Sequence, residues 1–400
     1  MAYTGRFLMP SSKKTNPAPH RQPLWLVCFA AIISMVLTVA LLWIPLTRTD
    51  SDQTVTGYNP DIMDTYNYYL SAQIGNMLHS VAPDASAPVQ QVYRLSDSDM
   101  VAPEPDQSCF GQAETAADLR PLLEAAAPLL DGQSTLFSPE TEIREGSTIH
   151  YYLDDTIFAV TWKQVVADCV YTFSEVKIAH ASQFRRFLSN GKYCSGVLHT
   201  TTEMSESVNA VVAASGDYYE YRTIGIVVNE GHVYRGRGHF LDTCYIDENG
   251  DLLFTYAGEY TDEAAVQQYV DQHNVRFSLS FGPVMLLDGE YRVPDIYNSG
   301  EINNPYARAA LCQMGPLHYV VVTANSEDPF YSVPTVGNFA LSLQELGIHT
   351  AYALDGGQTA AIAMNDQLIN TVSYGSQRKI SDIIYFATAI PSPQSQEVPQ

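Results

Sequence analysis

A long uncharged apolar run extends from Leu24 to Leu46. It is long enough to cross a bilayer as a helix, and Trp25 and Trp43 lie near its ends, where aromatic rings favour the membrane interface. Residues 1–23 are basic and contain no acid, whereas Asp50 follows the run. This asymmetry predicts a cytoplasmic N-terminus and an extracytoplasmic C-terminal domain in the cell membrane. We interpret the run as an uncleaved signal anchor. A cleaved signal peptide is the alternative, but the run exceeds a usual signal core.

Prolines and polar residues divide the rest of the chain. Several prolines among Asp, Ser and Ala make residues 47–108 a stalk or linker. Residues 109–147 are expected to be only partly helical, because Pro121 and Pro128 interrupt their apolar pattern. The sequence thus predicts six segments: a cytoplasmic tail (1–23), a transmembrane anchor (24–46), a stalk (47–108), a partly helical lead-in (109–147), a folded domain (148–390) and a disordered tail (391–400).

From about Thr148 the pattern changes to short apolar runs separated by polar turns. Runs rich in β-branched and aromatic residues predict strands, and Asn-Gly and Asp-Gly pairs between them predict hairpins. Helices are expected at residues 262–273 and 339–347, and a short one at Ser182 to Leu188. The predicted fold class is therefore α+β, with mixed β-sheets, hairpins and a few helices.

Charge and cysteine usage narrow the function. The net charge of -23 argues against nucleic acid as a partner, because phosphate backbones require basic patches. Six cysteines occur without any Cys-x-x-Cys pair, so a zinc site of that type is not expected, while disulfides and free thiols both stay open. The histidines are scattered without the i, i+4 spacing of a zinc helix. We expect no cofactor, although the many acids leave calcium binding open.

One apolar strand ends in residues that can carry chemistry. The run Thr350 to Leu354 is followed by Asp-Gly-Gly-Gln-Thr at residues 355–359. Glycines allow backbone N–H groups to approach a ligand, because they have no Cβ. The Asp355 carboxylate beside them is a candidate acid or base. The alternative is an ordinary turn, since Asp-Gly is common in turns.

Two other stretches have similar potential. The apolar run 210–214 leads into Ser-Gly-Asp-Tyr-Tyr, in which Asp217 lies beside a glycine. Alternation along a strand predicts that one of Tyr218 and Tyr219 is available to a sugar while the other fills the core. Arg308 begins a strand-like run, and its guanidinium suits a phosphate or a carboxylate. The alternative for Arg308 is a surface ion pair with one of the many acids.

Taken in order, four segments of the chain resemble the phosphodiester glycosidase family, whose bacterial members include exopolysaccharide-related proteins. The resemblance covers roughly Thr148 to Ala389. The matching segments are Ala214 to Tyr219 (family pattern Asn-Gly-Gly/Asp-Phe-Phe), Phe281 to Leu286 (Gly-Pro-apolar), Asn304 to Ala310 (Asn-Pro-Arg-Thr-Ala) and Leu354 to Thr359 (Leu-Asp-Gly-Gly-Gly-Ser-Ser).

The chain departs from the family pattern at several positions. Gln358 and Thr359 replace a glycine and a serine, Ser215 replaces an asparagine, and two extra residues precede Arg308. These changes support an alternative function, a non-catalytic envelope protein that binds polysaccharide through a degenerate site.

The resemblance implies cleavage of a sugar 1-phosphodiester, GlcNAc-like, or of a related linkage in the cell envelope or an exopolysaccharide. The expected partners are a carbohydrate or sugar-phosphate polymer and, through residues 24–46, the lipid bilayer. Asp355 and Asp217 are the expected catalytic carboxylates, because oxocarbenium-like transition states need a carboxylate near the anomeric carbon. The expected substrate-binding residues are Arg308, Gly356, Gly357, Ser215, Gly216, Tyr218, Gln358 and Thr359.

Overall fold

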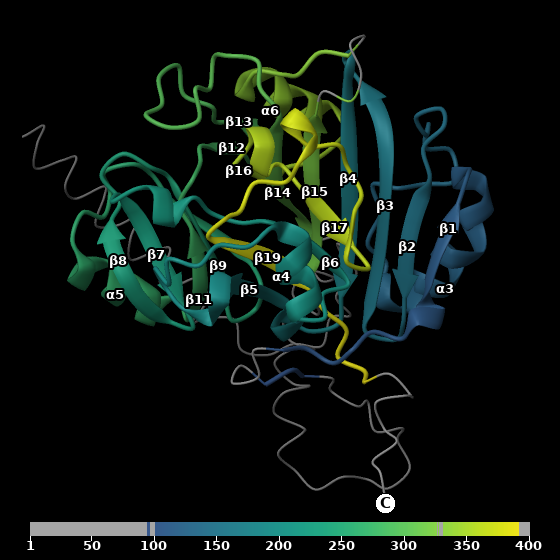
Figure 1. Ribbon diagram of the computed structural model, residues 1–400, viewed down its shortest axis with the longest axis horizontal. Coiled ribbons are helices and arrows are strands. Elements are labelled where there is room, and N and C mark those ends of the chain that lie inside the picture. The colour runs from purple at the N-terminus through teal and green to yellow at the C-terminus, as the bar shows by residue number, and fades with distance from the viewer. Residues whose placement is uncertain (1–93, 97–100, 326, 328–330, 392–400) are drawn as a thin grey trace, which may run out of the picture. The chain divides into compact units, whose positions relative to one another are not determined.

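The computed structural model describes residues 94–96, 101–325, 327 and 331–391 (Figure 1). The predicted membrane anchor, residues 24–46, and most of the predicted stalk lie outside these ranges. Within them, no helix is both long and apolar enough to span a membrane. All the described residues belong to one compact unit, residues 90–400.

A nine-stranded antiparallel sheet is the largest element of the described unit (Figure 1). Its strand order is β1-β2-β3-β4-β15-β14-β16-β12-β13. The strands are β1 (Phe110–Ala113), β2 (Ile149–Leu153), β3 (Ile157–Val166), β4 (Cys169–Ile178), β12 (Val284–Leu287), β13 (Glu290–Tyr291), β14 (Arg308–Gly315), β15 (His318–Asn325) and β16 (Thr350–Leu354).

Two five-stranded antiparallel sheets complete the β structure of the described residues. One has the order β10-β9-β11-β7-β8 and the other β18-β17-β6-β19-β5. The first contains β7 (Gly225–Asn229), β8 (His232–Arg237), β9 (Thr243–Asp247), β10 (Leu252–Thr255) and β11 (Val275–Leu279). The second contains β5 (Phe184–Leu188), β6 (Val212–Ser215), β17 (Ile362–Met364), β18 (Gln367–Leu368) and β19 (Asp382–Phe386).

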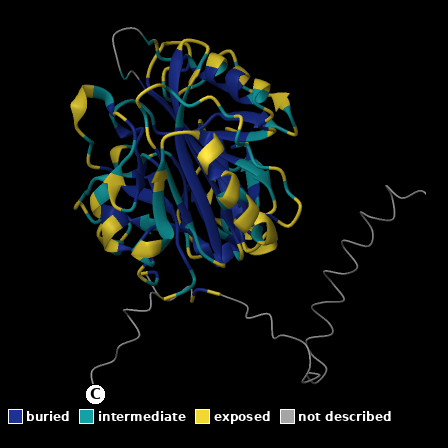
Figure 2. Cartoon of the chain, turned by 90° about the vertical axis from the view of Figure 1, so that its right-hand side faces the viewer, coloured by how far each residue is buried: buried dark blue, intermediate teal, exposed yellow. Residues whose placement is uncertain are grey.

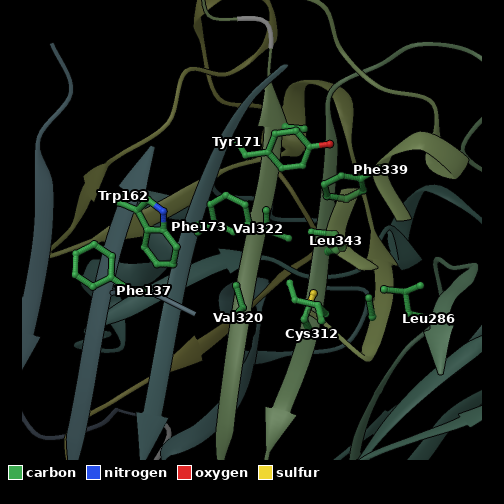
Figure 3. Packing of buried hydrophobic residues seen from close by; sticks show 14 of the residues in the cluster. Phe137, Trp162, Tyr171, Phe173, Leu286, Cys312, Val320, Val322, Phe339 and Leu343 are labelled. Carbon is green, nitrogen blue, oxygen red and sulfur yellow. The ribbon is translucent and has the colours of Figure 1, made fainter. Parts of the chain in front are cut away.

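The central strands of the nine-stranded sheet are buried on both faces, because their side chains alternate between two apolar clusters on opposite sides. In β14, Ala310 and Cys312 belong to one apolar cluster, together with Phe339 from a helix (Figure 3). Ala309 and Leu311 belong to a second cluster, which packs against strands of both five-stranded sheets. The central strands are therefore almost entirely buried, while the helices expose their outer faces (Figure 2).

Within the described ranges, four α-helices pack on the sheets, namely α3 (Arg120–Leu130), α4 (Thr201–Ser207), α5 (Glu263–Gln272) and α6 (Val336–Glu345). Helix α3 is continuous, although its prolines were expected to break it. Pro121 lies in the first turn, where its missing N–H is not needed. Pro128 is tolerated near the C-terminal end of the helix. Residues 109–147 are part of the folded unit, because β1 pairs with β2.

The α+β class is confirmed in its coarse form, mixed sheets with a few helices. One local prediction was wrong: residues 182–188 form the end of a 3₁₀ turn followed by β5, which pairs with β19. Sheet pairing overrides local helix propensity there. Among the described residues, all five cysteines are free thiols: Cys109, Cys169, Cys194, Cys244 and Cys312.

Candidate active site

A pocket of about 290 Å³ brings together five of the predicted site residues. It lies where strands of the nine-stranded sheet end and several loops converge. The predicted residues in its wall are Asp355, Gly356, Gly357, Arg308 and Tyr218. The others that line it are Phe281, Ser299, Gly300, Glu301, Tyr306, Ala307 and Arg378.

Strand register explains why Arg308 and Asp355 line the same pocket. Strands β14 and β16 are antiparallel neighbours, with Ala309 opposite Leu354. The start of β14 therefore lies beside the end of β16. The side chains one position further out, Arg308 and Asp355, both border the space beyond this edge.

The two glycines after Asp355 allow a close backbone contact. A Cβ on Gly356 would lie 2.5 Å from the carbonyl oxygen of Ala307. Gly357 has a φ of 64°, in the left-handed region that favours glycine. Its N–H donates to the Ala307 carbonyl at 2.7 Å. This N–H therefore joins two walls of the pocket and is already engaged by protein.

Asp355 is a buried carboxyl group with one oxygen that accepts no hydrogen bond from the described part of the protein. It is 9 % exposed, and its Oδ2 atom has no hydrogen-bond partner among the described residues. Burial raises the pKa of Asp355 to about 6, and the charge of Asp217 acts in the same direction. The Thr359 hydroxyl and the charges of Arg378 and Arg222 oppose the rise in pKa. Such a carboxyl group can exchange a proton near neutral pH.

Arg308 is bound mainly by backbone carbonyls. Its guanidinium donates to the carbonyl oxygens of Gly300, Glu301, Asn304 and Pro334. The Gly300 contact measures 2.8 Å. Burial lowers the pKa of Arg308 to about 10. The side chain thus fixes the 300–304 loop against the edge of the sheet, which leaves few of its donors for a ligand.

Asp217 lies behind the pocket and is fully engaged by protein groups. It is 2 % exposed and forms an ion pair with Arg222. Its carboxylate also accepts from the backbone N–H groups of Tyr218 at 2.5 Å and of Ser280 at 3.0 Å. Its own N–H donates to Asp382 at 2.7 Å. The structure therefore places Asp217 as a positioning residue beneath Tyr218.

Four other predicted residues support the pocket without lining it. Ser215 donates its hydroxyl to the Thr359 carbonyl. A Cβ on Gly216 would lie 2.9 Å from the Asp382 carboxylate. The Thr359 hydroxyl donates to the Gly356 carbonyl at 2.6 Å. Gln358 donates to the Ser376 carbonyl at 2.9 Å. These contacts connect strand ends and loops that form the pocket wall.

Arg378 is a pocket cation that the sequence did not indicate. It lies over the rings of Tyr218 and Tyr221, at 5.4 and 4.6 Å from their centroids. The two rings are stacked, with centroids 4.7 Å apart. No carboxylate of the described ranges pairs with Arg378. In contrast, Tyr219 is fully buried and donates to the Ser381 carbonyl, so Tyr218 faces the pocket and Tyr219 fills the core.

Glu301 is the second carboxylate of the pocket wall, a place the sequence had given to Asp217. It accepts from Asn304 Nδ2 at 2.8 Å and from the Tyr306 hydroxyl at 2.9 Å. These two bonds lower the pKa of Glu301. The pocket therefore contains one carboxyl group with a raised pKa and one with a lowered pKa. Glu301 and Arg378 lie in irregular loops, where the sequence offers only turn signals such as Ser299-Gly300 and Tyr374-Gly375.

The described residues contain no cluster of three or more His, Cys, Asp or Glu side chains that could hold a metal ion.

Residues 208–387 match the family model described as phosphodiester glycosidase. The family resemblance drawn from the sequence is thereby confirmed over this range, which begins after the first strands of the nine-stranded sheet. The coarse activity class that the match supports is a glycosidase acting on a phosphodiester. A search of curated protein sequences finds no match.

Solved structures that are similar at low identity include the following three. One is the catalytic domain of zebrafish N-acetylglucosamine-1-phosphodiester alpha-N-acetylglucosaminidase, auto-inhibited by its pro-peptide. It is 15% identical to this chain, and the alignment covers 65% of this chain and 92% of the zebrafish chain, with a TM-score of 0.47. A hypothetical protein from Synechocystis is 12% identical, with coverages of 62% and 64% and a TM-score of 0.43. A putative exported protein from Burkholderia pseudomallei is 11% identical, with coverages of 55% and 74% and a TM-score of 0.36. At these values the likenesses carry no functional conclusion.

Proposed function

We propose that this chain is a glycosidase that cleaves a sugar 1-phosphodiester, GlcNAc-like, or a related linkage of the cell envelope or an exopolysaccharide. The observation that carries the proposal is the pairing of two groups in one pocket of about 290 Å³. Asp355 has a pKa raised to about 6, and Arg378 lies in the same wall without a carboxylate partner in the described ranges.

Arg378 holds the phosphate of the substrate. A planar guanidinium matches two phosphate oxygens, and stacking on tyrosine rings orients the plane. Tyr221 also donates its hydroxyl to the Lys379 carbonyl at 2.9 Å, which anchors the loop beside Arg378. We assign the phosphate to Arg378 in place of Arg308, because the guanidinium of Arg308 is occupied by backbone carbonyls.

Asp355 acts as the general base. The group that leaves the anomeric carbon is a phosphate monoester, a weak base that departs without a proton, so a general acid is not essential. The ionised Asp355 carboxylate takes a proton from water while the water oxygen attacks the anomeric carbon. The bond from the anomeric carbon to the phosphate oxygen breaks, and its electron pair leaves with the phosphate. Glu301 stays ionised and stabilises the positive charge that develops on the sugar.

The predicted signal anchor would place this activity on the outer side of the cell membrane. That location suits a substrate in the envelope or in an exopolysaccharide, and it follows from the charge and length of residues 1–46 alone. Fractionation of cells expressing the full chain, with protease added from outside, tests it. Digestion of the C-terminal domain in intact cells is expected.

The test of the activity is hydrolysis of a GlcNAc 1-phosphodiester by the purified full chain. Asp355→Asn is expected to reduce kcat about a hundredfold or more, the usual contribution of a general base. Asp288→Asn is the matched control, because Asp288 lies in an exposed hairpin turn with a φ of 53°, which asparagine tolerates. Full activity of Asp355→Asn would refute the assignment. Binding of the diester by the wild type without turnover would instead establish the non-catalytic alternative.

A further inference from the structure

A nearly fully exposed tyrosine lies in a turn next to the pocket wall. Among the described residues, the two most exposed large apolar or aromatic side chains are Tyr374, at 92 %, and Ile296, at 84 %. Tyr374 belongs to the 3₁₀ turn η7 (Ser373–Gly375), and the loop that follows it carries Arg378. An aromatic ring that buries almost none of its surface contributes little to folding.

The backbone at Tyr374 is in an unfavourable region. Its φ is 62° and its ψ is 13°, which is uncommon for a bulky residue and would suit glycine or asparagine. The turn is closed by the Gly375 N–H, which donates to the Val372 carbonyl at 3.1 Å. The chain thus holds a large ring in solvent at a conformational cost. Such residues are found where function requires their position.

The Tyr374 turn is joined directly to the pocket wall. It contacts the short helix η6 (Gly357–Thr359), and the Gln358 amide donates to the Ser376 carbonyl. Tyr306, which lines the pocket and is 45 % exposed, lies near enough to Tyr374 for the two phenols to interact electrostatically. Arg308 supports the Tyr306 ring, with 5.6 Å from its guanidinium carbon to the ring centroid. Two tyrosines therefore present exposed ring surface at the rim of one pocket.

We propose that Tyr374 and Tyr306 form a stacking site for a second sugar ring of the substrate, outside the Asp355 pocket. The pocket of about 290 Å³ is at the lower limit of small-molecule sites, about 300 Å³, so a longer substrate must emerge past this rim. The apolar C–H face of a sugar packs on a tyrosine ring, and neighbouring polar groups such as Glu301 can accept bonds from its hydroxyls. The inference rests on the proposed function and extends it to the class of substrate, an oligosaccharide or polysaccharide joined through a phosphodiester.

The test compares two substrates with the full chain. One is the methyl diester of GlcNAc 1-phosphate, and the other is the diester of GlcNAc 1-phosphate with a methyl hexoside. The wild type is expected to prefer the hexoside diester in kcat/KM. Tyr374→Ala is expected to reduce that preference about tenfold, which is the upper range for one aromatic contact, while turnover of the methyl diester stays unchanged.

Three variants separate stacking from folding. Tyr374→Phe keeps the ring and is expected to keep the preference. Tyr374→Gly removes the ring and relieves the left-handed backbone, so it is expected to lose the preference without any loss of melting temperature. Tyr256→Ala is the matched control, because Tyr256 is 43 % exposed and does not line the pocket. An unchanged preference in Tyr374→Ala, with both diesters hydrolysed, would overturn the stacking site and leave the proposed function intact.

If the wild type hydrolyses neither diester, the proposed function fails. The stacking site is then tested by measuring the binding of an oligosaccharide. Chitotriose is then titrated into the wild type and Tyr374→Ala, and tyrosine fluorescence is followed. Binding that is lost with Tyr374 supports the site. Equal binding by the two proteins, or binding by neither, overturns it.

Discussion

Arg378 and Asp355 lie in the wall of the same pocket, and the positive charge of Arg378 lowers the pKa of Asp355 against the larger effect of burial. Removing the charge must therefore raise the pKa of Asp355 further. Because a general base works in its ionised form, activity is lost as the pH falls through the pKa of Asp355. We expect the acid limb of the kcat/KM profile near pH 6 in the wild type.

In Arg378→Gln we expect that limb to move to higher pH. Arg378→Lys keeps the charge, so it should hold the limb near its wild-type position even where phosphate binding weakens. A pH profile measured from pH 4.5 to 8.5 on the three proteins checks this. A limb at the same pH in Arg378→Gln would contradict the electrostatic link.

Asp355→Asn is expected to stabilise the fold at pH 8. Burial raises the pKa of Asp355 from 3.8 to about 6, so the folded state holds its proton more tightly than the unfolded state does. The wild type consequently loses stability as the pH rises from about 4 to above 6. A difference of roughly two pKa units corresponds to about 3 kcal/mol, which asparagine would recover. Urea unfolding at pH 8 and pH 4.5 tests this, with a gain expected only at pH 8. An Asp355→Asn protein less stable than the wild type at pH 8 would show that protein groups stabilise the ionised carboxylate of Asp355.

Asp217→Asn is expected to have the opposite effect on stability. Asp217 is buried, forms an ion pair with Arg222 and accepts backbone N–H groups. Loss of its charge leaves a partly buried guanidinium without compensation, and such losses amount to about 3 kcal/mol or more. Two nitrogens of Arg222, Nε and Nη1, are already buried without partners among the described residues. The free energy of unfolding at pH 8 should therefore be higher for Asp355→Asn than for the wild type, and lower for Asp217→Asn. An Asp217→Asn protein as stable as the wild type would argue against the positioning role of Asp217.

Gly356→Ala is expected to damage the pocket more than Gly357→Ala. The new Cβ at Gly356 would meet the Ala307 carbonyl at 2.5 Å, and a backbone group cannot yield as a side chain does. At Gly357 the space is open, and only the left-handed backbone opposes alanine, by about 1 kcal/mol. Melting temperatures and diester hydrolysis of the two variants provide the comparison. Comparable activity in both would mean that the contact with Ala307 does not shape the site.

The sequence by itself determined the local elements and the central carboxyl group. A short apolar run located the strand at residues 350–354 with the bounds that the structure gives it, and Asp-Gly-Gly after it indicated Asp355. These signals are local, because an apolar run and the backbone freedom of glycine are properties of consecutive residues. The helix predicted at residues 182–188 was wrong for the complementary reason: most of these residues form β5, whose state depends on pairing with β19, far along the chain.

Only the tertiary structure decided which polar groups serve the pocket. Arg308 and Asp217 have suitable chemistry in the sequence, but their hydrogen bonds and ion pairs are satisfied by protein groups. Arg378 and Glu301 acquire their place through loops that converge on the edge of the sheet. The raised pKa of Asp355 likewise comes from burial and from charges contributed by distant segments. Burial, hydrogen-bond partners and nearby charges depend on segments that are distant in the chain, so local sequence patterns do not predict them.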